Sequence, residues 1–373
     1  MLLGLAINAF YITQLNPKAR FTRIFFDSNV NKKTGCDFYA LYLATKNFTR
    51  GKNIYGDDPQ HKVVPCHFGY RYLPIGLVVG APFAAFTPKK AYQAWIIFLE
   101  LLVLVNVLLL WRVAPTDRIF GLGTFLIAAG SPLYLELYMG QYSLLQATFL
   151  FAALTASQKG QEGAFAGFFG ASLLWKLNTW IALPALLIKK RWKIVAVSAA
   201  LILLTTVPYV LWNHDAWDAI RYNFEPSILA GFTKGNHGLL AFVMKLLPKI
   251  APKTLVLAVP LVVVAVALIV NLIGRGAHMA DMIALWMAAY FLAYKHVWEH
   301  HYVMLVPVIV ILAVRYRSKF LLLPGALTAL PTIYYYPVQA SWSDVGLLIY
   351  HGQKPLAAML VFVFAAIKVL QGK

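Results

Sequence analysis

The stretch TLVLAVPLVVVAVALIVNLIG, residues 254–274, contains no charged side chain and forms one continuous apolar segment. Residues 194–213 and 137–158 are equally free of charge. Runs of about 20 residues are long enough to cross a hydrocarbon core of about 30 Å as helices. None of the three alternates apolar and polar residues as a strand of a membrane barrel would. They are therefore expected to be α-helices, which satisfy their backbone hydrogen bonds within one segment.

The composition of the whole chain agrees with this interpretation. Of the 373 residues, 60% are hydrophobic and 13% are charged, whereas a soluble domain carries about 25% charged residues. With the three runs above included, apolar segments are expected near residues 1–13, 72–87, 91–111, 119–135, 140–157, 163–188, 194–212, 254–273, 278–294, 302–314, 320–335 and 355–371. The sequence predicts an all-α, polytopic membrane protein with about eleven or twelve transmembrane helices, and one integral membrane domain over residues 1–373.

Two polar stretches, residues 14–70 and 213–253, interrupt the apolar segments. Basic residues in short loops favour the cytoplasmic side, which predicts that the clusters at 189–193, 275 and 315–319 face the cytoplasm. Counting spans from these clusters places 213–253 on the opposite side. We expect 14–70 to lie there too, as an outer catalytic loop that includes interfacial helices.

Three local features stay open at this level. Residues 72–87 are either a span or a re-entrant piece, and 163–188 are either one helix or a broken pair. Cys36 and Cys66 lie in the same polar stretch, where a disulfide is allowed if the stretch is outside the cytoplasm. The net charge of +19 is explained by basic residues at the ends of membrane helices and beside lipid phosphates. We do not expect nucleic acid as a partner.

Isolated charges beside apolar segments are the first candidates for chemistry. Asp37 lies among aromatic residues just beyond the first helix, and is either a general base or the start of the next helix. Lys176 is the sole charge between residues 163 and 188, and either contacts a phosphate or extends to the interface. Arg71 is either a phosphate partner or a headgroup anchor.

A second group of candidates surrounds residues 295–302. His296 and His300 have i,i+4 spacing, which suits a metal site, although hydrogen-bonding histidines at the interface explain the same pattern. His300 or His301 is a candidate for contact with a phosphate or an acceptor. Gln141, after Gly140, either binds a sugar hydroxyl or caps a helix. Glu136 and Asp281 lie near span ends and are expected at the interface.

Several of these residues belong to an ordered set of motifs. The set begins with G-x-D-F-Y-x-x-Y from Gly35, G-x-x-I-Y from Gly51 and Y-x-Y-x-P from Tyr70, and continues with Gly140-Gln141, Lys176 and W-E-H-H-Y from Trp298. In this order the motifs resemble the GT-C superfamily of membrane glycosyltransferases. The resemblance is closest to glycosyltransferase family 87, the polyprenyl-phosphate-mannose-dependent mannosyltransferases.

The resemblance implies an enzyme that moves a hexose, with mannose favoured, from a polyprenyl-phosphate sugar to a lipid or glycan acceptor, with inversion. Asp37 would be the general base at the extracytoplasmic face of a membrane, which we expect to be a bacterial plasma membrane. Neither a metal nor another cofactor is implied. We expect donor phosphate binding by Lys176, Arg71, His300 and His301. We expect substrate contacts from Gln141, Tyr70, Tyr72, Trp298 and Glu299.

A multi-pass transporter or lipid flippase is the alternative function. Such a protein is expected to contain inverted repeats and helices broken near the middle of the membrane. A break at Lys176 suits this alternative. No internal repeat is found in the sequence, however, and the long first loop with Asp37 would have no role.

Overall fold

The computed structural model describes residues 1–16, 18, 33–56, 64–66, 69–114, 118–213, 216–217, 236–332 and 344–372, and only the backbone for 344–350. Within these ranges the chain forms helices and no strand. The β-type pairing found there is one isolated bridge between Asn236 and Trp298. The predicted all-α class is therefore confirmed.

In the described part of the chain, six helical segments are long and apolar enough to cross a membrane. They are α4 (Pro88–Val113), α5 and α6 together (Arg118–Ala129 and Ser131–Met139), α10 (Trp192–Trp212), α13 (Pro252–Ile273), η6 and α15 together (Glu299–Met304 and Leu305–Tyr316) and most of α18 (Asp344–Gln371). Each crossing segment has 18 to 26 residues. At about 1.5 Å per residue, this length matches a hydrocarbon core, so the predicted polytopic character is confirmed.

Burial separates the long helices into two kinds. Only 11% of α10 and 17% of α13 is buried inside the protein, whereas 67% of α5–α6 and 72% of η6–α15 is buried. An apolar helix with so little protein contact must face lipid, because water would not tolerate its surface. α10 and α13 therefore form part of the lipid-facing exterior, and α6 and η6 belong to the interior that holds the polar residues described below.

Two further helices, α7 (Ser143–Gln158) and α14 (Met279–Ala293), complete the interior. α7 packs against α4, α15 and α8 (Glu162–Trp175), and α14 packs against α13 and α18. Nearly every residue of both helices is buried, as expected for helices that are apolar on all sides. Both are shorter than a full span, and α7 begins inside the protein at Ser143, which is fully buried.

The segment 74–85 is a series of short turns rather than one helix. It consists of η3 (Pro74–Gly76), α3 (Leu77–Gly80) and η4 (Ala81–Ala85). Pro74 begins the first turn, and Pro82 lies in the third. Even as a continuous helix, twelve residues would extend only about 18 Å, which is too short to cross the core. The structure thus favours the re-entrant alternative for this segment.

The segment 163–188 is a broken pair. α8 ends at Trp175, and Lys176 has extended backbone with φ −133° and ψ 145°. The chain then continues as η5 (Leu177–Ala182) and α9 (Leu183–Ile188). Non-helical backbone inside a membrane protein is stable only when protein groups satisfy its hydrogen bonds. The break therefore places Lys176 where neighbouring side chains can reach its backbone.

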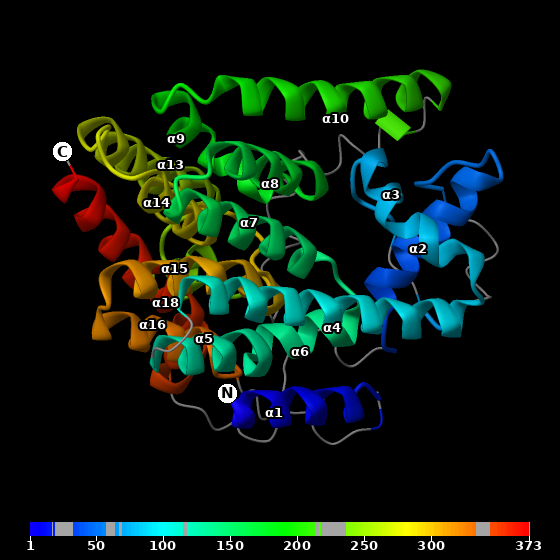
Figure 1. Cartoon of the computed structure of the whole chain (residues 1–373), viewed down its shortest axis with the longest axis horizontal. Coiled ribbons are helices and arrows are strands. Elements are labelled where there is room, and N and C mark those ends of the chain that lie inside the picture. The colour runs from blue at the N-terminus through cyan, green and yellow to red at the C-terminus, as the bar shows by residue number, and fades with distance from the viewer. Residues whose placement is uncertain are drawn as a thin grey trace.

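The two ends of the molecule differ in content. α2 (Cys36–Thr49) and α3 lie together at one end, on the right of Figure 1, and the C-terminus of α18 lies at the other, on the left. α10 runs along the top edge of this view and α1 (Leu2–Thr13) along the bottom. The remaining described elements are α12 (Leu239–Leu246), η7 (Lys319–Leu321) and α16 (Leu322–Ala329).

Predicted cytoplasmic residues meet at one place. His278, which precedes α14, interacts electrostatically with Arg315 and Lys189. The Arg315 guanidinium lies 3.3 Å from the carboxylate of Asp281, and Lys368 near the end of α18 also interacts with that carboxylate. Two of the three basic clusters therefore share one end of the helix bundle.

Candidate active site

Asp37 lies in the first turn of α2, where this helix packs against the end of α6. Gly35 caps α2 with φ 77°, and its N–H donates to the carbonyl of Tyr138 at 2.8 Å. Gly140 ends α6 with φ 69°, and a Cβ atom there would lie 2.5 Å from Cβ of Phe38. Left-handed backbone and close approach both require glycine at this position. The junction fixes Asp37 relative to the end of α6.

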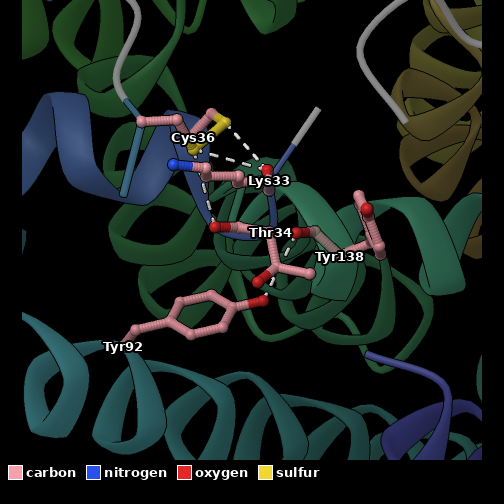
Figure 2. The surroundings of a disulfide bond; sticks show 6 residues. Lys33, Thr34, Cys36, Tyr92 and Tyr138 are labelled. Carbon is pink, nitrogen blue, oxygen red and sulfur yellow. Dashed lines mark hydrogen bonds between the residues drawn. A yellow bond between two sulfur atoms is a disulfide. The ribbon is translucent and has the colours of Figure 1, made fainter. Parts of the chain in front are cut away.

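A disulfide secures the same junction. Cys36, the residue before Asp37, is bonded to Cys66 with an S–S distance of 2.09 Å, so the pairing that the sequence left open is present (Figure 2). Tyr92 of α4 supports the other side, because its hydroxyl lies 3.3 Å from the carbonyl oxygen of Tyr138 (Figure 2). The same hydroxyl lies 3.0 Å from the carbonyl oxygen of Leu137. The start of α2 is thus held by a covalent bond and by the hydrogen bond from Gly35 to α6, while Tyr92 ties the end of α6 to α4.

Lys176 is held at the break by a side chain from α7. The side-chain amide of Gln146 donates to the carbonyl of Lys176 at 2.8 Å, to the carbonyl of Ser172 at 3.1 Å and to Oγ1 of Thr179 at 3.1 Å. These bonds satisfy the carbonyl groups that the interrupted helix leaves open. The break is therefore a built feature that directs the Lys176 side chain into the protein, where it is 7% exposed.

The ammonium group of Lys176 contacts the turn between α6 and α7. Nζ donates to Oε1 of Gln141 at 2.9 Å and to Oγ of Ser143 at 2.6 Å. It also lies 5.3 Å from the ring centre of Tyr72 and 5.1 Å from that of Tyr142. The Tyr72 hydroxyl donates to the same Gln141 oxygen at 3.2 Å. Gln141 and Tyr72, both predicted substrate contacts, thus meet Lys176 directly.

The charged groups of this region form one electrostatic cluster. Lys176 interacts with the carboxylates of Asp37 and Glu136, and Asp37 interacts in turn with Tyr72. Burial and the charge of Asp37 raise the pKa of Tyr72, so its hydroxyl stays protonated and serves as a donor. The structure therefore brings together Asp37 and Lys176, which are separated by more than a hundred residues in the chain.

His300 and His301 reach the same cluster from η6. Their rings meet edge to face with centroids 4.4 Å apart, and both interact electrostatically with Lys176. His300 is 2% exposed. In the described part of the chain, neither of its ring nitrogens has a hydrogen-bond partner. A buried nitrogen without a partner is costly, so His300 is a group that a ligand or water can satisfy.

Glu299 occupies a different environment from its neighbour. Its carboxylate lies 3.1 Å from Nζ of Lys354 in α18 and accepts hydrogen bonds from the hydroxyls of Ser131 and Thr332. Lys354 is fully buried and also donates to the carbonyl of Leu330 at 2.8 Å. In the described part of the chain, the partners of this carboxylate do not include Lys176. Glu299 therefore belongs to a separate buried ion pair with Lys354.

Three other predicted contacts surround the cluster. Tyr70 is 5% exposed, and its hydroxyl donates to the carbonyl of Leu73 at 3.0 Å. Arg71 is exposed and interacts electrostatically with Tyr72. Trp298 is half-buried, precedes η6 and pairs through its backbone with Asn236. Arg71 therefore stands at the exposed side of the cluster, and Tyr70 within its wall.

Some residues of the cluster were missed or misplaced by sequence reasoning. Glu136 was expected at an interface, but it is fully buried. Its carboxylate accepts a hydrogen bond from the N–H of Leu144 at 2.7 Å and so caps the start of α7. In the sequence, nothing marks Tyr142 and Ser143 as site residues except their position after Gln141. Lys354 had one detectable signal, since it is the sole charge between Asp344 and Lys368.

No group of three or more His, Cys, Asp or Glu side chains in the described ranges is arranged to hold a metal ion. His296, one member of the metal pattern considered from spacing, contacts the ring of Tyr294 with centroids 6.4 Å apart.

Comparison with known proteins identifies the family. A family model described as glycosyltransferase family 87 matches residues 70–293, which is more than half of the chain. The matched part includes Tyr72, Gln141 and Lys176 and ends before His300. No curated protein and no solved structure matches the chain. The family match and the six long apolar helices agree that this is an integral membrane glycosyltransferase, and the chain belongs to glycosyltransferase family 87.

Proposed function

We propose that this enzyme transfers a hexose, with mannose favoured, from a polyprenyl-phosphate sugar to a lipid or glycan acceptor. The reaction would take place at the extracytoplasmic face of a bacterial plasma membrane. The observation that carries the proposal is that Asp37 lies within electrostatic range of Lys176, whose ammonium donates to Gln141 and Ser143. This arrangement pairs a carboxylate that can accept a proton with a cation that can stabilise a departing phosphate, next to hydrogen-bonding groups suited to a sugar.

The proposed base is the half-buried carboxylate of Asp37. It takes the proton of the acceptor hydroxyl as the acceptor oxygen attacks the anomeric carbon of the donor. Attack occurs on the face opposite the bond to phosphate, so the configuration at that carbon inverts. The junction of α2 with α6 supports this role, because a fixed carboxylate keeps its orientation during proton transfer.

The proposed leaving group is polyprenyl phosphate. When the bond between the anomeric carbon and the phosphate oxygen breaks, its electron pair remains on that oxygen, and the phosphate gains a second negative charge. Lys176 is almost fully buried, where a cation stabilises new negative charge better than it does in water. The further proposed phosphate partners are Arg71, on the exposed side of the cluster, and His300 and His301 of η6.

The extracytoplasmic location is supported by two observations. Cys36 and Cys66 form a disulfide beside Asp37, and disulfides persist in compartments outside the reducing cytoplasm. Lys189 and Arg315 interact with His278, in a region that contains none of the residues of the Lys176 cluster. Basic residues favour the cytoplasmic side.

The test is transfer from polyprenyl-phosphate mannose to endogenous acceptors in membranes that contain one variant each. Asp37→Asn should lower kcat by about 10²- to 10⁴-fold, because it removes the base. Lys176→Met should lower kcat by about 10²- to 10³-fold, because it removes charge stabilisation of the leaving group. Radiolabelled sugar in extracted lipids and glycans measures both effects.

Glu162→Gln is the matched control, because Glu162 pairs with Arg191 and its side chain is 62% exposed. This variant should transfer sugar at the wild-type rate. Wild-type transfer in Asp37→Asn would remove the proposed base. Movement of lipid across the membrane without any glycosyl product would instead support a flippase.

A further inference from the structure

Two buried tyrosine hydroxyls, one beside Lys176 and one beside His301, have no hydrogen-bond partner among the described residues. Tyr142 is 1% exposed and Tyr290 is 4% exposed, and the hydroxyl of each is buried and unbonded. Most buried polar groups in folded proteins have a partner, because an unpaired one costs free energy. Two such hydroxyls beside a candidate active site therefore require an explanation.

The position of Tyr142 connects it to the reacting groups. Its ring centre is 5.1 Å from Nζ of Lys176 and 4.6 Å from the ring centre of Tyr72. It also interacts electrostatically with Asp37. Burial raises the pKa of the Tyr142 hydroxyl, so this group is neutral and can both donate and accept a hydrogen bond.

Tyr290 approaches the same region from α14. Its ring centre lies 6.5 Å from that of His301 and 5.1 Å from that of Tyr294, on which it is stacked. Tyr142 and Tyr290 thus border the Lys176 cluster from two different elements, the turn after α6 and the helix α14.

Other polar atoms of the cluster are unsatisfied in the same way. Oε2 of Glu136 and both ring nitrogens of His300 are buried without a partner in the described part of the chain. Glu136 and His300 each interact electrostatically with Lys176. Unpaired donors and acceptors around one cation match a ligand that carries several hydroxyl groups, since each hydroxyl both donates and accepts.

We propose that Tyr142 and Tyr290 bind hydroxyl groups of the sugar that is transferred, and so form the sugar subsite of the donor. This inference rests on the proposed function and names residues for one part of its substrate. Lys176 would hold the phosphate side of the donor, and the two tyrosines would hold the sugar ring. The unbonded hydroxyls would then gain their partners when the donor binds.

The test compares Tyr142→Phe and Tyr290→Phe with wild-type enzyme. Each variant should bind polyprenyl-phosphate mannose about three- to tenfold more weakly, the effect of losing one neutral hydrogen bond. Each should bind polyprenyl phosphate, which lacks the sugar, with wild-type affinity. Titration of purified enzyme with each ligand, followed by intrinsic fluorescence, provides both affinities.

Thermal unfolding distinguishes this role from a structural one. Because the two hydroxyls have no hydrogen-bond partner among the described residues, their removal should leave Tm unchanged or raise it. Tyr316→Phe is the matched control at the other end of the bundle, where the hydroxyl donates to Asp281 at 2.8 Å. This control should lower Tm and leave the affinity for the donor unchanged.

Each contrary outcome has a definite meaning. If the variants bind both ligands equally more weakly, the tyrosines contact the phosphate or the lipid rather than the sugar. If their affinity for the donor is unchanged, water satisfies the two hydroxyls. Either result overturns the sugar subsite while transfer by wild-type enzyme leaves the proposed function intact. If wild-type enzyme neither binds nor uses the polyprenyl-phosphate sugar, the proposed function fails and the subsite fails with it.

Discussion

Lys176 depends on neighbours that one buried glutamate organises. Its ammonium donates to Gln141 and Ser143. The backbone carbonyl of Glu136 accepts the N–H of Gln141 at 3.0 Å, and its side-chain carboxylate accepts the N–H of Leu144 at 2.7 Å. Glu136 also interacts electrostatically with Lys176. We infer that Glu136 positions the lysine, both through its charge and through the turn that carries the lysine's partners.

This role predicts non-additive effects in a double-mutant cycle. Glu136→Gln keeps an acceptor for Leu144 and loses the charge, so kcat/KM should fall by about tenfold in wild-type enzyme. In the Lys176→Met background, the same change should have little further effect, which corresponds to a coupling of about 1–2 kcal/mol. Transfer rates for the four enzymes give the coupling.

Glu100→Gln provides the comparison, because Glu100 of α4 accepts from Asn8 of α1 rather than from the turn at 140–143. Its effect should add to that of Lys176→Met. If the Glu136 and Lys176 effects add as well, Glu136 does not act through the lysine, and its role is limited to capping α7.

At this scale the sequence was informative where a charge stood alone. Asp37 was selected because it lies just beyond an apolar segment, and Lys176 because it is the sole charge within one. The structure places both in one cluster. Glu136 was assigned to an interface, because nothing in the sequence indicates that its carboxylate caps α7. The unpaired hydroxyls of Tyr142 and Tyr290 depend on three-dimensional packing and give no signal in the sequence.

At the scale of elements, a second polar cluster holds helices together. Lys354 of α18 pairs with Glu299 of η6, and Ser131 of α6 donates to the same carboxylate. Lys354 also donates to the carbonyl of Thr328 in α16 at 2.5 Å. Four elements are thus linked by one ion pair that is nearly inaccessible to solvent. Because His300 directly follows Glu299, this pair also fixes the start of η6.

Breaking this pair should destabilise the fold more than losing any surface pair. Lys354→Met leaves the carboxylate of Glu299 buried without its cation, which costs about 3–5 kcal/mol. Thermal unfolding in detergent should show a clear decrease in Tm. The double variant Glu299→Met with Lys354→Met should recover part of it, since no charge is then left unpaired.

The exposed pair between Glu162 and Arg191 provides the scale for comparison. Glu162→Gln should cost about 0–1 kcal/mol, as solvent-exposed pairs do. An equally small effect for Lys354→Met would show that water reaches Glu299, and that the ion pair does not hold these elements.

The apolar runs predicted most helices, because length and absence of charge decide membrane spans. The breaks were harder to predict. Whether residues 163–188 formed one helix or two depended on Gln146, which bonds to the Lys176 carbonyl across 30 positions of the chain. A local pattern cannot include such a contact. The short turns at 74–85 likewise follow from Pro74 and Pro82 together with their packing on α2 and α4.

At the scale of the whole molecule, the two ends of the bundle carry different chemistry. The end with α2 contains the disulfide and Asp37, and the other contains the basic residues around His278. The positive-inside tendency and the oxidising requirement of a disulfide are independent arguments, and both favour the extracytoplasmic side proposed for α2. Their agreement makes the orientation of the chain directly testable.

Cysteine labelling in intact cells should show this orientation. The sequence has two cysteines and both form the disulfide, so the wild-type chain offers no free thiol as background. Thr49→Cys at the end of α2 and Arg275→Cys after α13 each introduce one exposed thiol. A maleimide that cannot cross the membrane should label Thr49→Cys in intact cells, and Arg275→Cys only after permeabilisation. The reverse pattern would place Asp37 in the cytoplasm, where the disulfide would be reduced and the proposed extracytoplasmic transfer could not occur.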